Sequence, residues 1–346
     1  MRGLMIKIEE KGATLFLDLL EASLKEVRQL TEDEIGVILS TGFMAFMIDA
    51  YGLAKYEMAA YLRNLGNDTP VSKDPVKAMF EEGFRSCYDL KRIKELRRNV
   101  EAITKIDYRA AEELALLYLP PRTDIKCTVY VTVDEFNPGM VRNGNMGLSV
   151  LTQEVQGDIS YLAHEFHHLG FNCWLSKSPS LRSEFQGKTT YERVAIRLVL
   201  HLTMEGMANH FCTPWIVKTG AERSQRDNDK IRRYEENITA MLGEVVKLLS
   251  DCVHESASAE DCEERLMNNI ILDPEKILPP VHYIGANIIG KIEEKKIVER
   301  RTIIDLCRKP DNLLVYYSKV AESEGWPRIP EEVQHHVVKL IRERTS

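Results

Sequence analysis

His164-Glu165-Phe166-His167-His168 is the stretch that decides how the rest of the chain is interpreted. It matches the pattern H-E-x-x-H. In a helix, residues four apart share a face, so His164 and His168 can bind one metal ion together. Glu165 would stand beside that ion, where a carboxylate can take a proton from a metal-bound water. The stretch therefore predicts a metal-binding helix with a general base next to the metal.

A hydrolytic zinc site needs a third protein ligand and one open position for water. A histidine six residues after His168 is one solution, but Trp174 stands there. The best candidate is Glu205, because an apolar stretch with helical spacing runs directly into it. Gly206 is small, which would let this helix approach the helix of the two histidines closely. Glu192 is the alternative third ligand.

These residues together resemble the gluzincin metallopeptidases. They are closer still to predicted zinc-dependent peptidases that carry an H-E-x-H-H helix and a downstream E-G-x-A helix. The matching stretches here are residues 163–170 and 204–210, with a weaker Tyr-x-x-Gly likeness in residues 282–290. The likeness spans roughly residues 125–295, and nothing before about residue 120 contributes to it.

The resemblance implies the chemistry of the site. It implies one zinc ion per chain, held by His164, His168 and Glu205, and a peptide or small protein as substrate. Glu165 would be the general base that passes a proton from water to the leaving amine. Tyr283 would donate a hydrogen bond to the oxyanion that forms on the attacked carbonyl.

Other histidines near these motifs are candidates for supporting roles. His282, next to Tyr283, is a competing donor to the oxyanion. His167 faces away from the two ligands and is more typical of a packing residue or of one that supports a ligand. His201 lies one turn before Glu205 and would be a core histidine, a substrate contact or a hydrogen-bond partner of Glu205.

The pattern of the whole chain predicts an α+β fold that is mostly helical. Residues 126–133 alternate and are rich in β-branched side chains, which is typical of a strand, and residues 145–151 could form a second strand. In the metallopeptidases that the chain resembles, an edge strand beside the zinc helix pairs with an extended substrate, and Gly147 would leave the backbone there open to it. A hairpin that only packs on the core is the alternative. We expect this small β-sheet beside the H-E-x-x-H helix, which would run from an N-cap at Asp158 to Leu169 with Gly170 at C′.

The remaining elements are predicted helices. Before the strands, the helical segments are 13–30, 32–50, 52–65, 74–84, 90–104 and 107–118; after them come about 221–253, a helix around Tyr283, 312–323 and 330–344. Leu119-Pro120-Pro121 marks the best internal boundary. The chain is thus expected to contain a helical N-terminal region, residues 1–120, and a zincin-like catalytic domain with C-terminal helices, residues 121–346.

The amino-acid composition limits the classes of protein to which this chain can belong. With 44% hydrophobic and 29% charged residues, the chain has the make-up of a globular protein. A net charge of −7 gives no electrostatic reason to expect nucleic acid or an anionic membrane as partner. Seven cysteines without a C-x-x-C pair indicate reduced thiols and a cytoplasmic location, and the first residues do not predict a signal peptide. The sequence does not indicate the oligomeric state.

Two other classes of function remain open at this point. Glu165-x-x-His168 and Glu332-x-x-His335 are two E-x-x-H pairs, as a di-iron carboxylate oxidoreductase in a helix bundle requires. The strand pattern before His164 argues against a pure bundle. A non-catalytic zinc-binding protein would keep the metal ligands, but it would not need the carboxylate of Glu165.

Overall fold

The computed structural model describes residues 5–67, 69–135, 137–150, 159–177, 188–218, 224–273, 275 and 277–342. The described chain is mostly helical with one small mixed sheet, so the predicted α+β class is confirmed. It forms two compact units. The sheet unit comprises Met1–Glu113 and Ile125–Leu169, and the helical unit comprises Leu114–Asp124 and Gly170–Ser346. The domain boundary expected after residue 120 stays a prediction.

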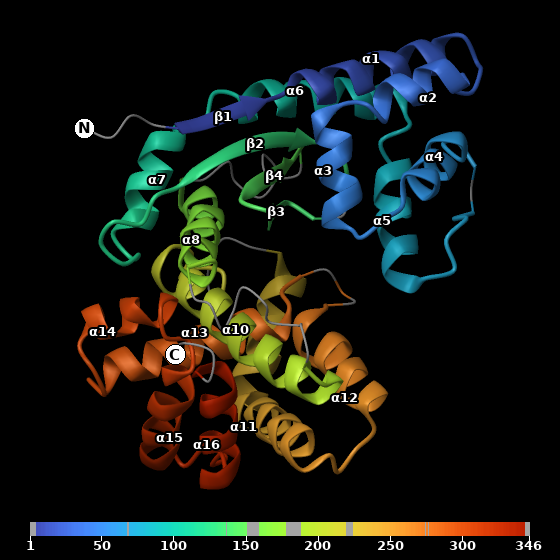
Figure 1. Ribbon diagram of the computed structural model, residues 1–346. Helices are drawn as coiled ribbons and strands as arrows, with labels where there is room; N and C mark the ends of the chain where they lie inside the picture. Colours follow the sequence, from blue (N-terminus) through green and yellow to red (C-terminus); the bar gives the residue numbers. More distant parts are fainter. Residues whose placement is uncertain are drawn as a thin grey trace. The chain divides into compact units, whose positions relative to one another are not determined.

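Four strands build the sheet of the sheet unit, in the order β1-β2-β4-β3 (Figure 1). β2 (Lys126–Thr132) and β4 (Asn145–Ser149) confirm the two predicted strands, and they pair in parallel. β1 (Met5–Glu9) and β3 (Gly139–Arg142) were not predicted. β1 pairs in parallel with β2, and β3 pairs antiparallel with β4. Among the described strands, β3 is therefore an edge strand and lies beyond β4.

Gly147 has a different role from the one expected. It lies on β4, an inner strand, and a Cβ there would collide with the ring of Phe46. Phe46 belongs to α3 (Gly42–Ala50), which packs on the sheet. The idea that Gly147 leaves an open backbone for substrate is wrong, because this glycine makes room for a core aromatic side chain.

The helices that precede β2 follow the predicted segments, although several are shorter than predicted and one is split. They are α1 (Lys11–Lys25), α2 (Glu32–Ile38), α3, α4 (Lys55–Arg63), α5 (Pro75–Arg85), α6 (Leu90–Ile103) and α7 (Tyr108–Leu116). The segment 32–50 divides into α2 and α3, because the Thr41 side chain accepts a hydrogen bond from Met44 N and so caps a new helix. Phe16 of α1 stacks on Phe84 of α5 in the core beneath them.

The H-E-x-x-H stretch lies in α8 (Ile159–Leu175), as predicted. The expected end of this helix at Leu169 is wrong, since the helix continues for six more residues through Gly170. A Cβ at residue 170 would meet the side chain of Leu119, which packs there, so this glycine serves close packing rather than termination. Asp158, the expected N-cap, lies outside the described residues.

In the helical unit, α10 (Thr190–Phe211) carries Glu205. The elements after it are α11 (Gln225–His254), α12 (Ala259–Leu266), a π-helix at Met267–Ile271, α13 (Pro280–Glu294), α14 (Arg300–Ile304), a 3-10 turn at Asp305–Cys307, α15 (Asn312–Glu324) and α16 (Glu331–Arg342). α11, α13, α15 and α16 confirm the helices predicted for this part of the chain. In the described part of the chain, no helix combines the length and apolar character that crossing a bilayer requires.

α10 and α13 cross at two glycines. A Cβ on Gly206 would lie 2.6 Å from the carbonyl carbon of Gly285, and a Cβ on Gly285 would lie 2.8 Å from the Cα of Gly206. The small residue at position 206 therefore serves close helix packing, as expected, and its neighbour is Gly285, so it brings α13 onto α10. The expected approach to the helix of the two histidines stays a prediction.

A buried ion pair fixes the chain just before α13. The Lys230 ammonium pairs with Asp273, whose carboxylate also accepts hydrogen bonds from the backbone N–H groups of Glu275, Ile277 and Leu278. Burial alone would raise the pKa of Asp273, but the Lys230 ammonium and these N–H groups outweigh it and hold the pKa below its usual value. Asp273 thus fixes the backbone of the residues that lead into α13.

Candidate metal centre

His164 and His168 lie one turn apart on α8, as the motif predicts. Their rings meet edge to face, with centroids 4.4 Å apart and planes at 83°. Both side chains are buried, with 4% and 5% of their surface exposed. Two imidazoles that converge in a buried place can offer a pair of nitrogen ligands to one metal ion. His167, between them, is fully buried, which suits the packing or supporting role predicted for it.

Glu165 is a buried carboxylate that lies against the edge strand. A Cβ added to Gly139, the first residue of β3, would lie 2.9 Å from Glu165 Oε1 and 2.9 Å from the hydroxyl oxygen of Tyr161. Tyr161 precedes Glu165 by one turn of α8, so the two polar groups approach the strand from one helix face. Only a glycine at position 139 leaves both groups in these positions. The structure thus places the predicted base beside an edge strand that the sequence did not reveal.

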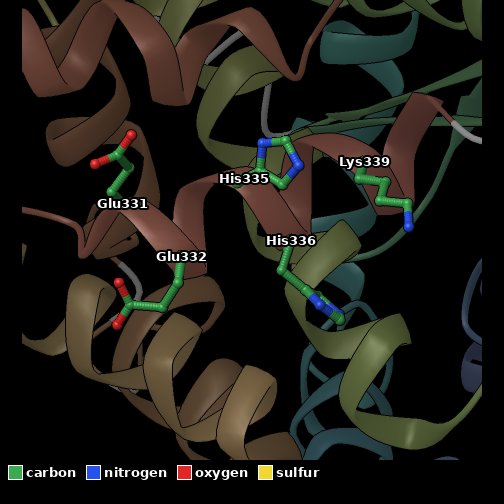
Figure 2. Close-up of a pocket in the computed structure, with 5 residues that line it drawn as sticks. All are labelled: Glu331, Glu332, His335, His336 and Lys339. Carbon is green, nitrogen blue, oxygen red and sulfur yellow. The ribbon is translucent and has the colours of Figure 1, made fainter.

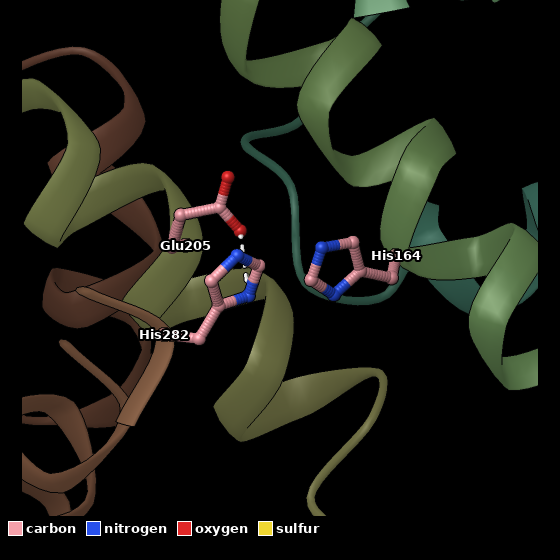
Figure 3. Close-up of side chains that lie close together, drawn as sticks. All are labelled: His164, Glu205 and His282. Carbon is pink, nitrogen blue, oxygen red and sulfur yellow. Dashed lines mark ion pairs between the residues drawn. The ribbon is translucent and has the colours of Figure 1, made fainter. Parts of the chain in front are cut away.

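Glu205 and His282 form a second pair of candidate residues, in the helical unit. His282 Nδ1 lies 3.3 Å from Glu205 Oε2, a contact that is an ion pair when the imidazole is protonated (Figure 3). The crossing at Gly206 and Gly285 explains this proximity, because Glu205 precedes one glycine and His282 lies one turn before the other. Glu205 is 9% exposed, so a carboxylate is held in a nearly water-free place.

Two fully buried polar residues complete this pair. Asn209 Nδ2 lies 2.8 Å from the Glu205 carbonyl oxygen and 2.9 Å from His282 Nδ1, and Thr213 Oγ1 lies 3.2 Å from Asn209 Oδ1. Sequence reasoning missed both residues. The signal for Asn209 was its spacing, since positions 205 and 209 are four apart and so share one face of α10, whereas Thr213 lies just beyond the end of that helix.

Tyr283 faces away from this group. Its side chain is buried in an apolar cluster with Ile231 and Leu278, and its ring lies 5.4 Å from that of Tyr234. Burial raises the pKa of Tyr283 to about 12. Adjacent residues on a helix point about 100° apart, so α13 turns His282 toward Glu205 and Tyr283 toward the core. The role of Tyr283 as donor to the oxyanion stays a prediction.

His201 and Glu192 hold other positions on α10. His201 Nδ1 lies 2.8 Å from the carbonyl oxygen of Arg197, one turn earlier on the same helix, and its part in the site stays a prediction. Glu192, the alternative third ligand, belongs to a capping box. Its carboxylate accepts the N–H of Thr189, and the Thr189 hydroxyl accepts the N–H of Glu192. The Glu192 carboxylate is therefore engaged in capping the start of α10.

The E-x-x-H pair of the di-iron interpretation lies on α16. Glu332 and His335 are exposed and line a surface pocket together with Glu331, His336 and Lys339 (Figure 2). Among the described residues, neither of them belongs to a group of three or more side chains that could hold a metal ion. A di-iron site needs two such pairs facing each other in a bundle core, so this placement does not favour it.

Comparison with known proteins identifies a family. The family described as "Putative zinc dependent peptidase (DUF5700)" matches residues 43–325. The match begins well before residue 125, so the expectation that the helical N-terminal region contributes nothing to the likeness is wrong. No curated protein and no solved structure matches the chain. Since the match spans more than half of the 346 residues, the chain belongs to this family.

Proposed function

We propose that the chain is a gluzincin-like peptidase in which His164, His168 and Glu205 hold one zinc ion and Glu165 is the general base. The observation that carries the proposal is the pair of buried imidazoles on α8 with a buried carboxylate beside them, set against an edge strand. Imidazole nitrogen and carboxylate oxygen are the donors that catalytic zinc sites use. The donor types and their burial therefore fit zinc.

Each residue then has a defined task. When bound, zinc would polarise the carbonyl of the substrate and lower the pKa of water. Glu165 follows His164 directly, so it points off the ligand face and stays available as a base. Its carboxylate takes the proton of the attacking water and gives it to the nitrogen of the leaving amine. His282 or Tyr283 donates a hydrogen bond to the developing oxyanion.

The proposed substrate is a peptide or small protein in extended conformation, and neither nucleic acid nor a membrane is a proposed partner. Among the described strands, β3 pairs with β4 on one side only, and its first residue, Gly139, lies beside the carboxylate of Glu165. An extended segment could add to such an edge through main-chain hydrogen bonds. We also propose a cytoplasmic location, which the seven free cysteines support.

Metal analysis and chelation test the proposal together. Purified protein should contain one zinc per chain and hydrolyse members of a quenched-fluorescent peptide library. A chelator should remove both metal and activity, and added zinc should restore both. His168→Ala should lose the metal because two remaining ligands bind zinc weakly. Two irons per chain would instead support the di-iron oxidoreductase, and a protein that takes up no zinc would end the proposal.

Gly139→Ala should slow hydrolysis without unfolding the protein. The new Cβ would lie 2.9 Å from Glu165 Oε1 and from the hydroxyl oxygen of Tyr161, both at the ends of flexible side chains. These side chains can move, so stability should fall by only about 1 kcal/mol, the lower end of the usual cost of an added methyl group in a packed place. A displaced base should nevertheless lower kcat by about 10²-fold.

Steady-state kinetics and urea unfolding check this expectation. Gly36→Ala is the matched control, because no atom lies within 4 Å of a Cβ at that position. Equal kcat values for Gly139→Ala and the control would show that β3 does not constrain Glu165.

A further inference from the structure

We infer that Asp134 is a positioning residue: it holds the start of β3, and with it Gly139, against the proposed base Glu165. The inference rests on the proposed function for the role of Glu165. Asp134 acts through Asn137 and Pro138, which lie between it and the first residue of β3. All of these residues belong to the sheet unit.

Asp134 is an acidic residue with none of its surface exposed. It follows the last residue of β2 by two positions. A carboxylate removed from water needs hydrogen-bond donors to offset the loss of its hydration. Its Oδ2 accepts from the hydroxyl of Thr132 at 3.1 Å, and its Oδ1 accepts from the N–H of Asn137 at 3.2 Å. The Asp134 carboxylate therefore ties the backbone ahead of β3 to the end of β2.

The side chain of Asn137 continues this connection to β3. Its Oδ1 accepts from the N–H of Gly139 at 3.4 Å, a bond of the kind that Asn and Asp side chains make to the backbone two residues on. Asp134 holds the backbone of Asn137, and Asn137 in turn holds the first residue of β3. Two side chains in succession thus determine where the strand starts.

Ser149, the last residue of β4, binds the same stretch at two points. Its hydroxyl donates to the carbonyl oxygen of Asp134 at 2.6 Å, and its N–H donates to the carbonyl oxygen of Pro138 at 3.0 Å. Ser149 is fully buried, and β4 is an inner strand of the sheet. The residues that lead into β3 are therefore fixed to the interior of the sheet as well as to β2.

Glu165 lies at the end of these contacts. A Cβ on Gly139 would lie 2.9 Å from Glu165 Oε1, so the backbone at the start of β3 is a wall against the carboxylate. If this wall moved away, the side chain of Glu165 could adopt other rotamers. A misplacement of about 1 Å in a reacting group can cost about 10²-fold in rate. The position of the proposed base thus depends on a buried carboxylate of a different element.

Glu81 provides a matched control in the same unit. It is also fully buried, and its carboxylate also accepts backbone N–H groups, from Val71 at 2.9 Å and from Ser72 at 3.0 Å. These residues precede α5, so Glu81 holds a different part of the chain. Glu81→Ala should therefore destabilise the protein as Asp134→Ala does, but it should leave β3 in place.

Hydrogen exchange of the full-length protein tests the positioning without any assumption about activity. Asp134→Ala should speed the exchange of the β3 amides by about tenfold, because the start of the strand is released. Asp134→Asn keeps an oxygen that can accept from Asn137 and should restore most of the protection. Glu81→Ala should speed exchange at residues 71 and 72 and leave β3 as in wild type.

Ser149→Ala is the milder variant if Asp134→Ala does not fold. It removes only the hydroxyl bond to the Asp134 carbonyl, and it should speed β3 exchange severalfold. Exchange of β3 at the wild-type rate in whichever of these two variants folds would overturn the inference. So would equal acceleration of β3 in Glu81→Ala.

A double-mutant cycle gives the kinetic readout. Asp134→Ala should lower kcat by about tenfold, and its combination with Gly139→Ala should be no slower than Gly139→Ala alone, since both changes act through the position of Glu165. Glu81→Ala should keep the wild-type kcat while it is folded. Losses that multiply, or an equal loss in Glu81→Ala, would show that Asp134 acts through stability alone. If the wild-type protein hydrolyses no peptide, the proposed function fails, and hydrogen exchange still decides whether Asp134 positions β3.

Discussion

Glu165→Gln should abolish peptide hydrolysis while the protein keeps one zinc per chain. The amide has nearly the shape of the carboxylate, so the packing against Gly139 and the positions of His164 and His168 should persist. It has no negative charge and cannot accept the proton of the attacking water. Loss of a positioned general base typically costs 10²–10⁴ in rate, and a buried carboxylate next to the reacting water should be near the upper part of that range, at about 10³ or more.

The matched control is Glu332→Gln. It makes the same chemical change in the other E-x-x-H pair, at an exposed position on α16, and should leave hydrolysis unchanged. Zinc by plasma mass spectrometry and kcat/KM on one peptide substrate are the measurements. Full activity in Glu165→Gln would refute the proposed mechanism. A wild-type chain that holds zinc but shows no Glu165-dependent turnover would be the non-catalytic zinc protein.

Gly206→Ala should destabilise the protein by about 3 kcal/mol. The added Cβ would lie 2.6 Å from both the carbon and the oxygen of the Gly285 carbonyl, and backbone atoms cannot rotate away as a side chain does. α10 and α13 must separate, which costs packing along the whole crossing. Separation would also pull Glu205 from His282, so hydrolysis should fall in the protein that still folds.

Gly243→Ala provides the comparison for a helical glycine without a close neighbour. The nearest atom to a Cβ at this position of α11 is 3.9 Å away, in Pro327. Alanine has the higher helix propensity, so this variant should gain up to about 1 kcal/mol. Urea unfolding of both variants measures the difference. Gly206→Ala with wild-type stability would show that the two helices do not meet at these glycines.

What the sequence could predict depends on the range of the interactions involved. The helix with His164 and His168, and the helix with Glu205, follow from spacing that is local to each segment. The partners of Gly206 and Gly170 do not, because a glycine reveals that something comes close but not which residue. Sequence reasoning named α8 for Gly206, and it did not foresee Gly285, a residue with its own reason to be small.

The sequence also did not predict short strands or the directions in which neighbouring side chains point. β3 has four residues and follows a turn signal at Asn137-Pro138-Gly139, so no period-2 pattern could develop. Tyr283 and His282 are neighbours, and the motif could not tell which one meets Glu205. That depends on which face of α13 carries Gly285, and His282 shares this face by lying one turn before the glycine.

The parallel pairing of β1 with β2 has a consequence for how the protein comes to be folded. Met5 pairs with Lys126, and five consecutive residues of each strand are in register. Seven of the described helices, α1 to α7, separate the two partners in the chain. Closing so large a loop costs entropy before any ladder bond forms, and contacts of high sequence separation slow folding. During synthesis, the helices between the strands can form early, but the sheet that supports β3 and Glu165 must wait until the ribosome has passed β4.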